Sequence, residues 1–287
     1  IGTSSGLNIY DGEVFRHFLH DNSDKDTNSR SINDIITSGD TAWLATQDGL
    51  FMMDVRTKSY KKQDIGENKN IRTLSLDKAN NKLWVGTNTG LIELSINSGV
   101  IREFNTANSN ISHNLIRALY QGSDGALWIG TYNKLNKLAP NSSLFKIIDL
   151  DLENGQNQSN QLILSVRSKS VINDSLLLVG TQRDGLVILN QKSNKKTFFN
   201  QQNSLLQNNV VKTTLVTKSD KVWLGTDFGL AELDTSMGFT IHLHNPFIDN
   251  SLANSIIWDI FEDQSGALWL GTNNGLSILF NKKNRFN

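Results

Sequence analysis

The chain contains no cysteine and only two prolines, Pro140 and Pro246, among its 287 residues. The absence of cysteine excludes disulfide bonds, thiolate nucleophiles, cysteine-ligated zinc and iron–sulfur clusters. No apolar run approaches the roughly 20 residues of a membrane-spanning helix, so we expect no membrane contact by this region. The first residue is Ile1 rather than Met, and we therefore expect the chain to be part of a longer polypeptide.

The chain also lacks an excess of charge of either sign. It has 28 Lys and Arg residues against 28 Asp and Glu residues, which gives a formal net charge of zero. A nucleic-acid binder usually needs a basic surface to displace phosphate counterions, so no nucleic-acid partner is expected. With 38% hydrophobic and 20% charged residues, the composition is that of an ordinary folded protein.

A repeated segment dominates the sequence. Leu-Trp-Val-Gly-Thr at 83–87 returns as Leu-Trp-Leu-Gly-Thr at 268–272, and related segments occur along the whole chain. Short β-branched and aromatic runs, separated by Gly, Asn and Asp, predict strands in every unit. A period of about 45 residues is the size of one four-stranded propeller blade. The sequence therefore predicts one all-β domain over 1–287, a seven-bladed β-propeller of four-stranded antiparallel blades. Its units are anchored at Gly2, Ala45, Gly86, Gly130, Gly180, Gly225 and Gly271.

Two features of the repeat predict how the blades pack. A tryptophan stands two residues before five of the anchors, which favours packing between blades over a cofactor site. These residues are Trp43, Trp84, Trp128, Trp223 and Trp269. The anchor glycine is expected to allow a neighbouring strand to approach closely.

One inner strand is missing from the count. Seven anchor strands, six with Gly-Thr and one with Ala-Thr, have only six inner-strand partners, which start near Ile32, Ile71, Ile116, Ile163, Val211 and Ile257. The sequence therefore predicts that one blade lacks its inner strand within 1–287. Because an unpaired edge is unfavourable, we expect the missing strand to lie before Ile1 or after Asn287.

The repeat resembles that of a known family. LWVGTNTGLIEL at 83–94, LWLGTNNGLSIL at 268–279 and the opening IGTSSGLNIYDGEVFRHFLHD are similar to the two-component regulator propeller repeat. This resemblance implies a non-catalytic sensor module on the periplasmic or extracellular side of a bacterial inner-membrane protein. It also implies downstream domains in the same polypeptide, with histidine kinase or diguanylate cyclase output, and a homodimer as partners.

Side chains that do not repeat predict a ligand site at the mouth of the central channel. The position at the start of each inner strand varies while its neighbours repeat: Asn33, Arg72, Arg117, Leu164, Lys212 and Trp258. Turn residues extend this surface: Gln47, Asp48, Tyr132, Arg183, Asp227 and Phe228. Arg and Lys suit an anion, and Trp stacks on a sugar, so an oligosaccharide or another small ligand is expected. Alternatively, these charges pair with acidic neighbours such as Asp34 or Asp259.

The sequence leaves several interpretations of the connections and of the function open. The long connections 21–31 and 149–161 either overhang the mouth or are solvated connectors. The domain could be a protein-interaction scaffold without a small ligand. The repeat is also similar to that of the metal-dependent streptogramin lyases, which implies a cluster of His and carboxylate side chains at the mouth. Only His113 lies in a loop that faces it, and no metal, cofactor or catalytic residue is predicted.

Overall fold

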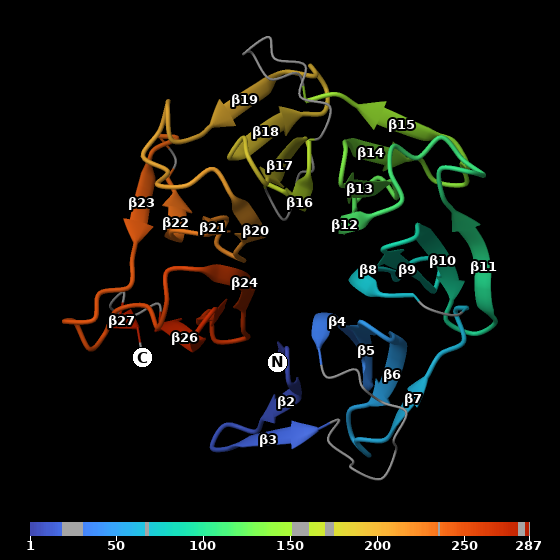
Figure 1. Ribbon diagram of the computed structural model, residues 1–287, viewed down its shortest axis with the longest axis horizontal. Coiled ribbons are helices and arrows are strands. Elements are labelled where there is room, and N and C mark those ends of the chain that lie inside the picture. Colours follow the sequence, from blue (N-terminus) through green and yellow to red (C-terminus); the bar gives the residue numbers. More distant parts are fainter. Residues whose placement is uncertain are drawn as a thin grey trace.

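The computed structural model describes residues 1–18, 31–66, 69–150, 161–169, 175–234, 236–280 and 285–286, and every regular element within them is a β-strand. The strands form seven antiparallel sheets, arranged as blades around a central axis (Figure 1). The predicted all-β, seven-bladed propeller is confirmed.

Within a blade the chain runs from the axis outward. The inner strands are β4 (Ile32–Ser38), β8 (Ile71–Asp77), β12 (Ile116–Gln121), β16 (Ile163–Ser168), β20 (Val211–Val216) and β24 (Ile257–Glu262). The second strands carry the anchors and are β1 (Gly2–Thr3), β5 (Thr41–Thr46), β9 (Lys82–Thr87), β13 (Leu127–Thr131), β17 (Leu176–Thr181), β21 (Val222–Thr226) and β25 (Leu268–Thr272).

Two further strands complete each blade toward the rim. The third strands are β2 (Gly6–Tyr10), β6 (Gly49–Asp54), β10 (Leu91–Ser95), β14 (Leu135–Leu138), β18 (Leu186–Asn190), β22 (Gly229–Leu233) and β26 (Gly275–Phe280). The outer strands are β3 (Phe15–Phe18), β7 (Tyr60–Lys62), β11 (Gly99–Phe104), β15 (Phe145–Ile148), β19 (Lys196–Phe199), β23 (Phe239–His242) and β27 (Arg285–Phe286).

The blades are not all alike. Blade 1 consists of β1–β3, whereas each later blade has four strands, from β4–β7 in blade 2 to β24–β27 in blade 7. In the described part of the chain, β1 therefore has no inner strand beside it, as the count of repeats predicts. The N-terminus lies near the axis, between β24 and β4 (Figure 1).

The hydrophobic core is divided among the interfaces between blades. Six clusters of buried side chains each join two consecutive blades, from blades 1 and 2 to blades 6 and 7. Trp84 of blade 3, for example, packs in one cluster with Ile116 and Phe145 of blade 4. Trp43, Trp84, Trp128 and Trp223 are 1–6% exposed, so the predicted packing role of these tryptophans is confirmed.

The repeated Gly-Thr pair has a mechanical explanation. A Cβ added to Gly225 would lie 2.6 Å from Thr213 Cγ2 and 2.8 Å from Ile257 Cγ2 of the next blade, so only glycine fits there. The following threonine secures the turn, because Thr226 Oγ1 donates a hydrogen bond to the carbonyl of Gly229 (2.8 Å). Thr131 makes the equivalent bond to Lys134 (2.9 Å), although that turn lacks the glycine.

Candidate functional site

A β-bulge interrupts every inner strand at the same place. The pairing with the second strand shifts between Ile71 and Thr73, between Ile116 and Ala118, and at the equivalent points of the other four inner strands. The residues inside the bulges are Asn33, Arg72, Arg117, Leu164, Lys212 and Trp258, the varying positions noted in the sequence. Bulges re-aim side chains and occur often beside binding sites. Six side chains of five different types are thereby presented at one end of the channel, which we call the mouth.

The turns after the second strands lie at the same end of the blades. The backbone N–H groups of Tyr132 and Asn273 donate to the carbonyls of Leu115 (3.0 Å) and Ile256 (3.1 Å), each directly before an inner strand. Trp258 Nε1 also lies 3.4 Å from Asn273 Oδ1. The structure therefore brings bulge and turn residues together, as expected from the sequence.

Arg72 and Arg117 occupy neighbouring bulges on β8 and β12. Both side chains are half-buried, and in the described residues neither has an acidic partner. Arg72 Nε is buried without a hydrogen-bond partner in this part of the chain. Burial, and then the positive charge of Arg72, lower the pKa of Arg117. Among the described residues, no carboxylate compensates the two positive charges on this side of the mouth.

Lys212 has a different environment on the opposite part of the ring. Its Nζ lies 3.0 Å from Asp227 Oδ1 and 3.9 Å from the ring centroid of Trp258. The alternative that mouth charges pair with acidic neighbours is thus correct for Lys212, although the partner is the turn residue Asp227. Trp258 is still 53% exposed, so part of its ring remains open to solvent.

The other candidate residues fall into two groups. Asn33 has a structural contact, because its Nδ2 donates to the carbonyl of Ile71 at 2.6 Å. Tyr132 and Phe228 are 39% and 48% exposed, and Arg183 is exposed on its turn. The Tyr132 ring contacts His113, with centroids 5.3 Å apart. Most of the connections 21–31 and 149–161 lies outside the described residues.

Inside the ring, two carboxylates lie within electrostatic reach of Arg167, a residue that was not predicted from the sequence. Burial raises the pKa of Asp34, which accepts backbone hydrogen bonds from Leu74 (2.7 Å) and Ile35 (2.8 Å). Burial also raises the pKa of Asp259, but its side chain is open to solvent, so we expect a smaller rise than at Asp34. Arg167 attracts both carboxylates. Arg167 stands out when the inner strands are aligned, because the residues at the same position in other blades, such as Ser75 and Leu215, are uncharged.

No group of three His, Cys, Asp or Glu side chains in the described ranges is placed to hold a metal ion, and His113 Nδ1 accepts the backbone N–H of Leu115 (2.9 Å). Those ranges also contain no helix long and apolar enough to cross a membrane.

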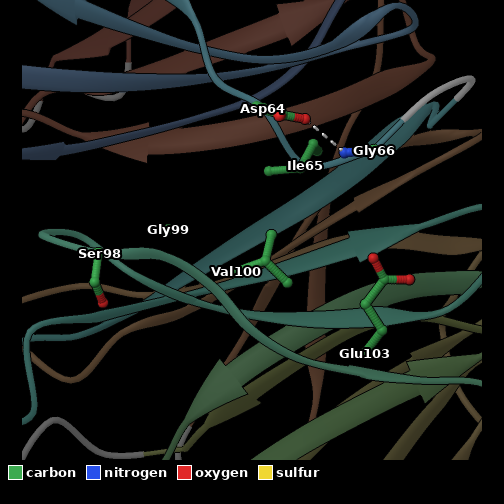
Figure 2. Close-up of a pocket in the computed structure, with 7 residues that line it drawn as sticks. All are labelled: Asp64, Ile65, Gly66, Ser98, Gly99, Val100 and Glu103. Atoms are coloured by element: carbon green, nitrogen blue, oxygen red, sulfur yellow. Dashed lines mark hydrogen bonds between the residues drawn. The ribbon is translucent and has the colours of Figure 1, made fainter.

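A hollow of about 470 Å³ lies beside the connection from β7 to β8 (Figure 2). In it Asp64 accepts the N–H of Gly66 (3.2 Å), and Glu103 pairs with Lys69 (2.6 Å). None of the candidate mouth residues lines this hollow. Its lining consists of Asp64, Ile65, Gly66, Ser98, Gly99, Val100 and Glu103.

Two segments of the chain match a known family model. Residues 110–133 and 251–274 match the two component regulator propeller. Each segment runs from the connection before an inner strand to the turn after the second strand. The two therefore include Arg117 with Tyr132 and Trp258 with Asn273. No curated protein matches the sequence.

Solved structures share the fold. One is the extracellular domain assigned to a hybrid two component system of B. thetaiotaomicron, with a TM-score of 0.84, 24% identity, and 96% of this chain and 36% of that chain covered. A second such domain from B. thetaiotaomicron has a TM-score of 0.78 and 22% identity, covering 98% of this chain and 37% of that chain.

Streptogramin B lyase is also similar, with a TM-score of 0.67, 12% identity, and 89% of this chain and 81% of that chain covered. These identities establish a common fold alone. The chain spans only 36–37% of the length of the two B. thetaiotaomicron domains. It is a seven-bladed β-propeller, two segments of which match the two component regulator propeller.

Proposed function

We propose that this propeller is the ligand-sensing, non-catalytic domain of a bacterial transmembrane signalling protein, on the periplasmic or extracellular side of the membrane. The observation that carries the proposal is the ring of six aligned bulges, which present different side chains at one end of an otherwise repetitive scaffold. The match to the two component regulator propeller and the likeness to extracellular domains of two component systems support it.

Signalling would arise from differential binding. A ligand that contacts several blades, or the mouth and a following domain, stabilises one arrangement of the full protein over another. A ligand with equal affinity for both arrangements would transmit nothing. The partners in this proposal are downstream domains of the same polypeptide and a second copy of it.

The mouth suits an oligosaccharide or another small ligand. Lys212 covers one face of the Trp258 ring, at 3.9 Å from its centroid, which leaves the other face for a sugar ring. Tyr132, Phe228 and Arg183 lie exposed on neighbouring turns and would widen the contact.

The binding half of the proposal is tested by thermal unfolding of the purified chain with a panel of neutral and acidic oligosaccharides. We expect at least one of them to raise the unfolding temperature of the wild type, and Trp258→Ala to lose this shift. Tyr60→Ala is the matched control, because Tyr60 is an exposed aromatic on the outer strand β7. Equal shifts in wild type and Trp258→Ala would contradict the proposed site at the mouth. Binding to purified partner domains, with no shift from any oligosaccharide, would favour a scaffold instead.

Location and the lack of catalysis need separate measurements. Protease added to intact spheroplasts should digest the propeller, whereas protection until lysis would contradict the proposed side of the membrane. A bound oligosaccharide should be recovered unchanged after prolonged incubation, as mass spectrometry can show. Conversion that disappears in His113→Ala would assign an enzymatic function instead.

A further inference from the structure

The two arginines at the mouth stand out because neither has a hydrogen-bond or salt-bridge partner among the residues that the structure describes. Lys212 at the same level has a carboxylate and an aromatic ring as partners. Arg72 and Arg117 have neither a salt bridge nor a hydrogen bond to any side chain whose placement is described. Buried polar atoms in folded proteins nearly always have a partner, so the bare Nε of Arg72 calls for an explanation.

Packing holds the backbone at the base of the two arginines in place. The residues directly before them, Ile71 and Ile116, are both fully buried. A Cβ added to Gly86 would lie 2.7 Å from Ile116 Cγ2, which shows how closely blades 3 and 4 approach. Asn33 of blade 2 donates to the Ile71 carbonyl at 2.6 Å and so fixes the backbone beside Arg72. The arginines therefore project from rigid bulges rather than from mobile loops.

We expect two like charges in neighbouring, half-buried positions to destabilise the free protein. Burial and the charge of Arg72 both act against the charged form of Arg117. A guanidinium nevertheless keeps its charge at neutral pH, so it cannot relieve the repulsion by losing a proton. A bound anion would remove both the repulsion and the unmet hydrogen-bonding capacity, and its binding is strengthened accordingly.

We propose that Arg72 and Arg117 together bind one oxyanion, a carboxylate or a sulfate group of the ligand that occupies the mouth. Arginine presents several N–H donors in a planar fork, and two forks side by side match the several oxygens of such a group. Lys212 is not part of this site, because Asp227 already neutralises it. The inference rests on the proposed function in taking the mouth as the ligand site.

Calorimetric titration of the purified chain at low salt tests it. The probes are sodium sulfate, glucuronate and glucose, the last two differing in a single carboxylate. We expect sulfate or glucuronate to bind, glucose not to bind, and the affinity to fall as sodium chloride is added. Arg72→Gln and Arg117→Gln should each weaken anion binding by about tenfold or more. Lys212→Gln, the control at the same mouth, should change it by less than about twofold.

Unfolding without ligand gives an independent readout. Because Arg117→Gln removes a repelling charge, it should raise the unfolding temperature by about 2 °C. Lys212→Gln should lower it, since it breaks an ion pair. A purely structural arginine would show the opposite sign on substitution.

The proposal is overturned if neither anion binds the wild type at millimolar concentration, or if Arg117→Gln binds as well as the wild type. Binding by sulfate alone or by glucuronate alone supports it and identifies the group recognised. A neutral oligosaccharide that binds through Trp258, with no response to either anion, overturns this inference and leaves the proposed sensor function standing.

Discussion

The interface between blades 6 and 7 and the seam between blades 7 and 1 use the same repeat sequence but pack differently. At the first, Ile257 lies against Gly225, and Trp223 is 4% exposed. At the seam, a Cβ on Gly271 would have no described atom nearer than 3.9 Å, and Trp269 is half-buried against Tyr10. The difference shows that the anchor glycine and the tryptophan of one blade are buried by the inner strand of the following blade. In the described residues, blade 1 has no inner strand beside β1, so Gly271 and Trp269 are less covered.

Truncation of the tryptophans should expose this difference most strongly. Trp84 is 6% exposed within the cluster that joins blades 3 and 4. Trp84→Ala should lower the free energy of unfolding by about 3–5 kcal/mol, because it leaves a large cavity. Trp269→Ala should cost only about 1–2 kcal/mol, since its ring is already in contact with water. Urea unfolding of both variants measures the two effects, and equal losses would contradict the contrast between interface and seam.

A single methyl group added at the anchor glycine sharpens the comparison. Gly225→Ala forces a Cβ against Ile257 and Thr213, so we expect a loss of about 1–3 kcal/mol from overpacking. Gly271→Ala brings its Cβ only into ordinary contact with the Asp259 backbone, at 3.9 Å, and should stay within about 0.5 kcal/mol of the wild type. Thermal unfolding of this matched pair provides the measurement. A destabilised Gly271→Ala would mean that the seam is filled in solution.

Substitution of the turn threonines should also cost more stability at the interface between blades 6 and 7 than at the seam, although both losses are smaller. Thr226 Oγ1 is buried, donates to Gly229 (2.8 Å) and accepts the N–H of Phe228 (3.0 Å). Thr226→Val keeps the shape but loses both bonds, at a cost of about 1–2 kcal/mol. Thr272 makes the equivalent bond to Gly275 (2.9 Å) in a more exposed place. Thr272→Val should therefore cost less than about 0.5 kcal/mol in the same unfolding assay.

The repeat made the fold predictable, because glycine, threonine and tryptophan stand in fixed places for mechanical reasons that do not depend on distant contacts. The number of blades, the first residue of each inner strand and the blade without an inner strand all followed from spacing. The site was only partly predictable. Alignment placed Arg117 and Lys212 at equivalent positions, but whether a charge has a partner depends on the turn beside it. Asp227 lies there in blade 6, whereas Tyr132 lies there in blade 4.

The smallest effect should be a change in pH dependence at the seam, where Asp259 lies on the last inner strand and Asp34 on the first. Burial raises the pKa of both carboxyls, so the folded protein holds their protons more tightly than the unfolded chain. Their contribution to stability is therefore present at low pH and lost as pH rises through the folded pKa values. The pKa of Asp263 is instead lowered to about 2. Its contribution to stability is therefore present above about pH 4 and is lost as the pH falls toward 2.

Asp259→Asn isolates the seam, because the amide keeps an oxygen to accept from Thr213 (3.2 Å) but cannot ionise. We expect its unfolding temperature to decline less than that of the wild type between about pH 4 and pH 7. Asp263→Asn is the control, and it should instead remove stability above about pH 4. A wild-type decline that Asp259→Asn leaves unchanged would show that water in the channel already screens this carboxylate.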